Sequence, residues 1–145
     1  MYKNVVIATD GSELAGKAVA QGMALAKALG ARVTLVTVTD LMPAMVSGDA
    51  TNLLSIQDYE RAASANATKI LDQAGAAAKA SGIAYDTVHV KDRHPADGIV
   101  ETAKDRRADL VVMASHGRRG LSKLLLGSQA MEVVSLSPVP VLICR

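Results

Sequence analysis

The sequence contains no phenylalanine and no tryptophan, and tyrosine occurs only three times. Half of the 145 residues are nevertheless hydrophobic, so the core must be built from Ala, Val, Leu, Ile and Met. Such a core suits helices that pack closely on a sheet. A chain of this length buries roughly two thirds of its unfolded surface without metals or disulfides. We therefore expect one domain that spans residues 1–145.

Cysteine is almost absent as well. The only one, Cys144, has no partner within the chain, which excludes an intramolecular disulfide and a cysteine-rich metal site and fits a reducing compartment. The apolar run before Asp10 is too short for a signal peptide or a membrane span. These observations predict a cytoplasmic protein that does not insert into a membrane.

The chain also has no large excess of positive or negative charge. Sixteen Lys and Arg against fourteen Asp and Glu give a net charge of +2, which is too small to indicate nucleic-acid binding by bulk electrostatics. We expect no nucleic-acid partner, and any anion site must be local.

The first forty residues have the pattern of a βαβ unit. A continuous apolar run at 5–8 predicts a buried strand, and apolar residues at helical spacing over 15–29 predict a helix that ends at Gly30. A β-branched run at 33–38 predicts a second strand. Because such crossovers are almost always right-handed and join parallel strands, the unit predicts a parallel sheet with helices on its faces.

The rest of the chain continues this alternation. We interpret the segment from Leu41 to about Leu54, which contains Pro43 and Gly48, as a mobile loop. Further helices are predicted over 56–78, after Pro95 and over 128–136, and further strands over 85–90, 110–114 and 139–144. No linker divides the chain, so the pattern predicts a single open α/β domain wound on both faces.

Two loops follow predicted strands and carry polar or glycine residues. Thr9, Asp10 and Gly11 follow the first strand, while the segment 115–120 follows the fourth and leads to Gly127-Ser128 before a helix. Glycines allow several backbone N–H groups to converge, and a helix N-terminus adds a partial positive charge. In open parallel sheets, ligands bind beyond the carboxyl ends of the strands where strand order reverses. These loops therefore predict an anion site.

The second loop resembles the nucleotide loop of the universal stress proteins. Ala114-Ser115-His116-Gly117, nine further residues and Gly127-Ser128 are similar to the motif of that family, and the first and last strands are similar as well. The resemblance covers nearly the whole chain. It implies a five-stranded parallel sheet of order 3-2-1-4-5, like that of the adenine nucleotide alpha hydrolases.

The resemblance also implies a stress-response regulator that binds ATP together with Mg or Mn. Gly117 and the backbone of Arg118 and Arg119 would face the phosphates together with Gly127, Ser128 and Gln129. Asp10 would lie near the ribose or a phosphate-bound metal, and Ala8, Thr9 and Val38 would border the adenine and ribose. The full set of expected ligand residues is Ala8, Thr9, Asp10, Val38, Ala114, Ser115, His116, Gly117, Arg118, Arg119, Gly127, Ser128, Gln129 and Ala130, with Asp10 as the metal residue.

Ala114 departs from the family pattern, because ATP-binding members begin this loop with glycine. Alanine costs about 1 kcal/mol where φ is positive, but the end of a strand predicts negative φ. Asp10 has a second interpretation as the N-cap of the following helix, and Ser128 as the cap of its own. His116 has no sequence signature of an activated nucleophile beside it, so we assign no catalytic residue.

The sequence is compatible with three functions. The first is an ATP-dependent regulator, and the second is at most a slow ATPase, since the sequence lacks a P-loop or kinase motif. The third is an interaction module without nucleotide, a reading that Ala114 favours. The last strand, Val139 to Cys144, resembles the dimerising edge of the family and predicts a homodimer. A regulatory protein partner is compatible with these three functions.

Overall fold

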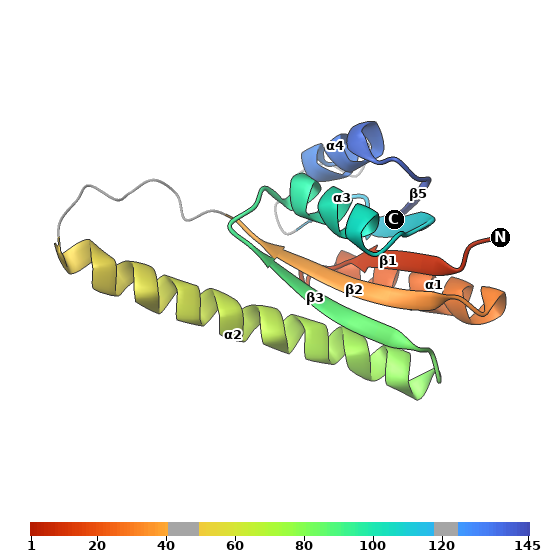
Figure 1. Ribbon diagram of the computed structural model, residues 1–145, viewed down its shortest axis with the longest axis horizontal. Helices are drawn as coiled ribbons and strands as arrows, with labels where there is room; N and C mark the ends of the chain where they lie inside the picture. The colour runs from red at the N-terminus through yellow and green to blue at the C-terminus, as the bar shows by residue number, and fades with distance from the viewer. Residues whose placement is uncertain (41–49, 118–124) are drawn as a thin grey trace.

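The computed structural model describes residues 1–40, 50–117 and 125–145, with the side chains of 50–55 excluded. Strands and helices alternate along the chain (Figure 1). The elements are β1 (Asn4–Ala8), α1 (Glu13–Leu29), β2 (Arg32–Thr39), α2 (Ala50–Ala80), β3 (Tyr85–Lys91), α3 (Pro95–Asp105), β4 (Leu110–Ala114), α4 (Ser128–Leu136) and β5 (Val141–Cys144).

The five strands form one sheet in the order β3-β2-β1-β4-β5, and every neighbouring pair is parallel. The predicted α/β fold and strand order are therefore confirmed. The chain runs outward from β1 through β2 to β3 and then crosses to β4 and β5 on the other side. Strand order therefore reverses between β1 and β4, and the loops after these two strands meet at the same edge of the sheet. This is the switch point at which open α/β sheets bind ligands.

Alternate side chains of each strand enter two separate cores. One core contains Ile7 and Leu35 and packs against α1 and α2, whereas the other contains Val6 and Val36 and packs against α3 and α4. Both cores are built mainly from aliphatic residues, alanine and methionine, as the lack of large aromatics predicts. The helices therefore cover both faces of the sheet, with one pair on each (Figure 1).

Two element boundaries differ from the prediction. Helix α2 begins at Ala50, so the expected loop up to Leu54 is wrong for its last residues, while residues 41–49 lie outside the described part. Both helix-breaking residues of this segment, Pro43 and Gly48, precede Ala50. Strand β5 begins at Val141 instead of Val139, because Pro140 has no N–H and contributes only its carbonyl, which accepts from Val111 N–H at 2.9 Å.

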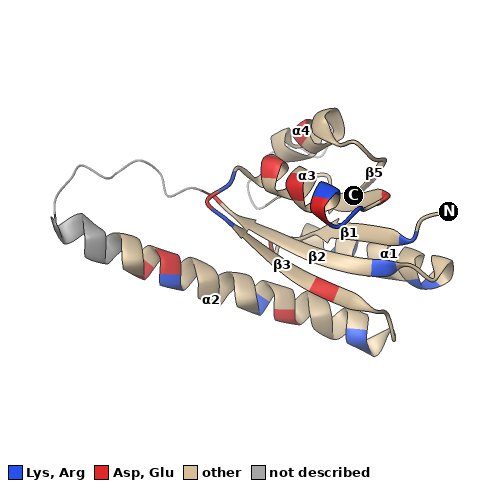
Figure 2. Ribbon diagram, viewed as in Figure 1, with Lys and Arg blue, Asp and Glu red and all other residues tan. Residues whose placement is uncertain are grey.

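Charges of both signs are mixed along the surface. Both α2 and α3 carry Lys or Arg as well as Asp and Glu in the view of Figure 2. None of the described helices has the combination of length and hydropathy that crossing a bilayer requires.

Candidate functional site

The loop after β1 is held by its own side chains. The Thr9 hydroxyl oxygen accepts from Gly11 N–H at 3.2 Å, and Asp10 Oδ1 accepts from Ser12 N–H at 2.9 Å. Ser12 is the N-cap of α1, since its hydroxyl oxygen accepts from Ala15 N–H at 3.2 Å. The interpretation of Asp10 as the N-cap is therefore wrong. The Asp10 carboxylate instead stabilises the turn that precedes the N-cap residue.

The loop after β4 is anchored at both ends by the backbone of Ser115. Ser115 N–H donates to the Cys144 carbonyl at 2.8 Å, and the Ser115 carbonyl accepts from Gly127 N–H at 2.8 Å. A Cβ atom added to Gly127 would lie 2.8 Å from the Ser115 carbonyl oxygen. Glycine is thus required at 127 by the closure of the loop, and its N–H binds the protein's own backbone.

Ala114 ends β4 in register with Cys144. The described non-glycine residues with positive φ are Asp92 and Arg107, so the negative φ predicted for Ala114 is confirmed. The methyl group of this alanine therefore carries no backbone strain.

The two loops approach each other closely. A Cβ atom added to Gly117 would lie 2.9 Å from Asp10 Oδ2, so the absence of a side chain at 117 leaves room for the carboxylate. Asp10 is partly buried and also lines the cavity between the loops. The carboxylate of one loop thus lies against the backbone of the other.

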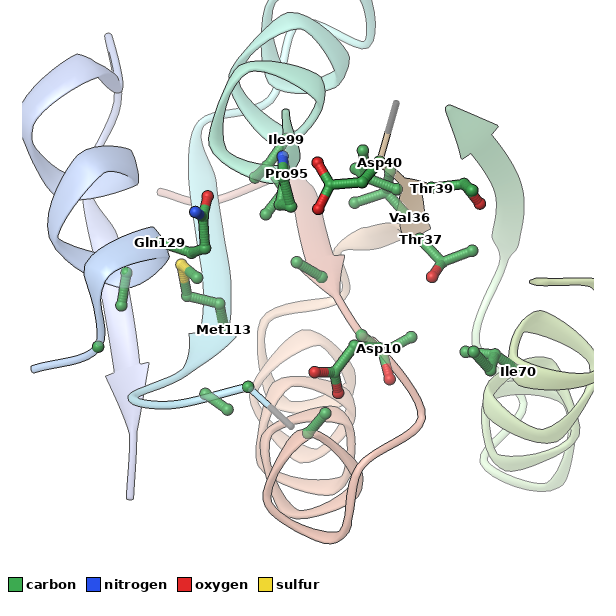
Figure 3. A pocket seen from close by; sticks show the side chains of 18 of the residues that line it. Asp10, Val36, Thr37, Thr39, Asp40, Ile70, Pro95, Ile99, Met113 and Gln129 are labelled. Carbon is green, nitrogen blue, oxygen red and sulfur yellow. The ribbon is translucent and has the colours of Figure 1, made fainter. Parts of the chain in front are cut away.

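A cavity of about 830 Å³ opens at this edge of the sheet. Twelve of the expected ligand residues line it, and Arg118 and Arg119 lie outside the described residues. Figure 3 shows Asp10, Asp40 and Gln129 approaching the cavity from three different elements. The expected residues that line the cavity are Ala8, Thr9, Asp10, Val38, Ala114, Ser115, His116, Gly117, Gly127, Ser128, Gln129 and Ala130.

Three parts of the cavity wall were not predicted from the sequence. Asp40 follows β2, Pro95 and Ile99 lie in α3, and Asn66 and Tyr59 lie on α2. Asp40 could have been found, because it follows a predicted strand whose carboxyl end lies at the ligand edge. The α2 and α3 residues are remote in sequence from both loops, and only the packing of the helices on the sheet brings them here.

Helix α4 contributes to the cavity through its first turn. Gly127 occupies the N-cap position without a side-chain cap and Ser128 is the first helical residue, so the expectation of Ser128 as a cap is wrong. The Ser128 side chain is exposed beside the cavity. The first backbone N–H groups of a helix have no intrahelical partner, which favours an anion at this end of the cavity.

Gln129 is bonded to the neighbouring helix. Its Oε1 accepts from Ala96 N–H at 3.0 Å, which satisfies a backbone donor at the start of α3, and its Nε2 lies 3.1 Å from His94 Nε2. Gln129 thus joins α3 to α4 at the wall of the cavity, instead of extending freely toward a ligand.

His116 contacts Ser115, whose hydroxyl oxygen lies 3.1 Å from His116 Nδ1. Ser115 is 5% exposed and also accepts and donates backbone hydrogen bonds within the loop. No group of three or more His, Cys, Asp or Glu that could hold a metal occurs among the residues placed by the structure.

One titratable group beside the cavity has a shifted pKa. Burial, with a smaller contribution from Lys91, lowers the pKa of His89 from its usual 6.5. Its Nε2 lies 2.7 Å from the hydroxyl oxygen of Thr39, which lines the cavity. His89 therefore favours the neutral form in the folded protein.

The fold and the site together define an α/β protein with a ligand cavity at the topological switch point of its sheet. The model of the universal stress protein family matches residues 1–145. The chain belongs to the universal stress protein family.

Two curated relatives match this chain along its full length. The Thermus aquaticus universal stress protein of the QAH/OAS sulfhydrylase 3′ region is 30% identical, with 100% of both chains covered. Universal stress protein MJ0531 of Methanocaldococcus jannaschii is 32% identical, with 100% of this chain and 83% of the relative covered.

Solved structures show the same fold. A universal stress protein in complex with cAMP is 32% identical, with a TM-score of 0.73 and coverage of 99% of this chain and 97% of the other. UspA from Lactobacillus plantarum has a TM-score of 0.80 at 24% identity, covering 99% and 98% of the two chains, which supports the fold alone.

Proposed function

We propose that this protein binds ATP, with Mg or Mn, in the cavity at the carboxyl edge of the sheet and acts as a nucleotide-dependent regulator of the stress response. The observation that carries the proposal is that both predicted loops line one cavity together with the first turn of α4. The relative in complex with cAMP, at 32% identity, supports an adenine nucleotide as the ligand class. We further propose that residues 1–145 form one domain and that the protein acts in the cytoplasm.

The residues present fit a metal that arrives with the nucleotide. Mg²⁺ is usually held by one or two carboxylates, several waters and the phosphates of its substrate. Asp10 supplies a carboxylate at the cavity, beside the Gly117 backbone. The first-turn N–H groups of α4 would bind phosphate oxygens, and the apolar residues Val38, Ile99 and Met113 would surround the base.

The test compares thermal unfolding with and without Mg-ATP, in protein shown to be free of bound nucleotide. A ligand present at 100 times its Kd stabilises the folded state by about 2.7 kcal/mol, so the Tm should rise clearly. Asp10→Asn retains an oxygen that can accept from Ser12 N–H but loses the charge. We expect this variant to bind Mg-ATP about tenfold more weakly, a loss of about 1.4 kcal/mol, and to lose the enhancement by Mg²⁺.

Asp97→Asn is the matched control, because Asp97 is an exposed carboxylate in the first turn of α3 and does not line the cavity. This variant should bind as the wild type does. A Tm that stays flat at millimolar ATP would refute nucleotide binding and favour the interaction module. Phosphate release that Asp10→Asn abolishes would instead favour the slow ATPase.

We also propose that the protein forms a homodimer through β5. Strand β5 is the last strand of the sheet, so one side of its backbone has no neighbouring strand within the chain. Leu142 in the middle of the strand is 39% exposed, and three apolar side chains of the adjacent α4, those of Met131, Val134 and Leu136, are exposed as well. A two-fold axis at this edge would pair the two β5 strands and cover apolar surface on both copies.

A further inference from the structure

A polar cluster joins three elements around one side of the cavity. His94 precedes α3, and its Nε2 lies 3.1 Å from Glu132 Oε2 of α4 and 3.1 Å from Gln129 Nε2 of the same helix. Its Nδ1 lies 3.9 Å from Asp40 Oδ1, which follows β2. Asp40, Pro95 and Gln129 also line the cavity. The histidine therefore connects the ends of β2, α3 and α4 at the site.

The orientation of the Gln129 amide is determined by its backbone partner. Ala96 N–H is a donor, so the atom 3.0 Å away must be the carbonyl oxygen of the side chain. The other end of the amide is then an NH₂ group, which can only donate. At 3.1 Å from His94 Nε2, it requires a lone pair on that nitrogen.

The contact with Glu132 requires the opposite protonation state of the same nitrogen. A carboxylate can only accept, so the 3.1 Å contact with His94 Nε2 requires a hydrogen on that nitrogen. One nitrogen cannot offer a lone pair and a hydrogen at once. In the neutral ring with the hydrogen on Nδ1, Nε2 accepts from Gln129, whereas in the charged ring Nε2–H donates to Glu132.

We propose that His94 is a proton-dependent positioning residue: when neutral it accepts from the Gln129 NH₂ group and fixes that amide at the cavity wall, and when protonated it donates to Glu132 and frees the Gln129 NH₂ group. Histidine is the side chain whose charge changes between about pH 5 and pH 8. Nucleotide affinity then depends on pH through the Gln129 contact, a consequence that rests on the proposed function.

The charged groups around the ring are consistent with this exchange. Asp40 and Glu132 face His94 from the end of β2 and from α4. On the same segment, Arg93 is paired with Glu101 at 3.3 Å, and Asp97 lies in the first turn of α3. The His94, Asp40 and Glu132 side chains are about half exposed, so solvent protons reach the ring.

The exchange itself is tested by nuclear magnetic resonance on the protein without nucleotide. The side-chain NH₂ signals of Gln129 should shift with the same midpoint as the ring nitrogens of His94, and Nε2 should be the unprotonated nitrogen at high pH. In His94→Gln, which offers a permanent carbonyl acceptor, the Gln129 signals should stay constant.

The consequence for binding is tested with ATP at pH 6 and pH 8. Relative to His94→Gln, wild-type affinity should be equal at pH 8 and about two- to tenfold weaker at pH 6, the loss expected for one hydrogen bond. Titration of the ATP phosphates is common to both proteins and cancels in the ratio. If the ratio of the wild-type and His94→Gln affinities does not change with pH, the link to binding is wrong. If the Gln129 signals do not shift together with the ring nitrogens of His94, the exchange is wrong. Protein that binds no ATP at any pH would refute the proposed function, while the Gln129 signals would still decide the exchange.

Discussion

At the scale of single residues, the polar side chains around the cavity mainly hold the protein's own backbone. Thr9 and Asp10 accept from N–H groups of the turn after β1, and Gln129 accepts from the first turn of α3. Each bond satisfies a backbone donor that has no partner within a helix or a strand ladder. The walls of the cavity are therefore fixed before a ligand arrives, which lowers the ordering cost of binding.

His89 gives a prediction at this scale. Because burial and Lys91 lower its pKa below the usual 6.5, the unfolded chain takes up a proton at a higher pH than the folded protein does. The corresponding stability is present above pH 6.5 and is lost as the pH falls toward the folded pKa. Chemical unfolding between pH 7.5 and 5 should show a smaller decrease in stability for His89→Gln than for the wild type.

Above pH 7 the same two proteins should differ by a constant amount, which separates the titration from any loss of packing. Parallel stability curves over the whole pH range would contradict the lowered pKa of His89.

Residue identities at the strand ends were predictable, but their partners were not. Thr9, Asp10 and Ser115 follow buried strands, and this position alone brings them to the cavity. The N-cap interpretation of Asp10 is wrong because Ser12 is the N-cap of α1. Asp and Ser satisfy the same helix donors, so the position of the cap depends on where the helix begins. The bond from Gln129 to Ala96 joins residues 33 positions apart and required the packing of α3 on α4.

At the scale of elements, small residues allow the helices to lie close to the sheet. A Cβ atom added to Gly22 of α1 would lie 2.6 Å from Ile7 Cδ1, which is fully buried in the sheet. Gly16 belongs to the same helix, but an added Cβ would meet nothing within 4 Å. The two positions therefore separate the backbone effect of glycine from its packing effect.

We predict opposite results for alanine at these two sites. Gly16→Ala should stabilise the protein by about 0.5–1 kcal/mol through helix propensity. Gly22→Ala gains the same backbone term but overpacks the core, and should destabilise by about 1–3 kcal/mol. Urea unfolding curves measure both, and a stabilised Gly22→Ala would show that α1 can move away from the sheet at no cost.

Most elements were predictable because strands and helices alternate here with distinct periods. Continuous apolar runs at β1, β2 and β4 and the apolar stripe of α1 agree with the structure to within a few residues. The start of α2 was missed because the expected loop was extended past Gly48, its last breaker. The start of β5 was missed because apolar residues continue across Pro140, where the ladder lacks a donor.

At the scale of the whole molecule, the proposed dimer predicts a mass near twice 15.0 kDa in light scattering at micromolar concentration. Val141 and Ile143 pack against the core beneath α3 and α4, so a charge there would damage the fold. Leu142 is 39% exposed, and Leu142→Lys should dissociate the dimer by placing like charges on facing strands.

Thr87→Lys is the matched control, because Thr87 is an exposed residue of β3, the strand at the opposite edge of the sheet. This variant should keep the dimer mass. A wild-type mass of one chain over the micromolar range would refute the β5 dimer.

The scarcity of large aromatics also has an optical consequence. Without tryptophan, near-ultraviolet absorption and intrinsic emission come from three tyrosines alone. Tyr2 and Tyr85 pack against the core that α1 and α2 cover, whereas Tyr59 lines the cavity and is 37% exposed. Tyr59 is therefore a natural fluorophore at the site, and replacing it with phenylalanine would separate the signal of the cavity from the signal of the core.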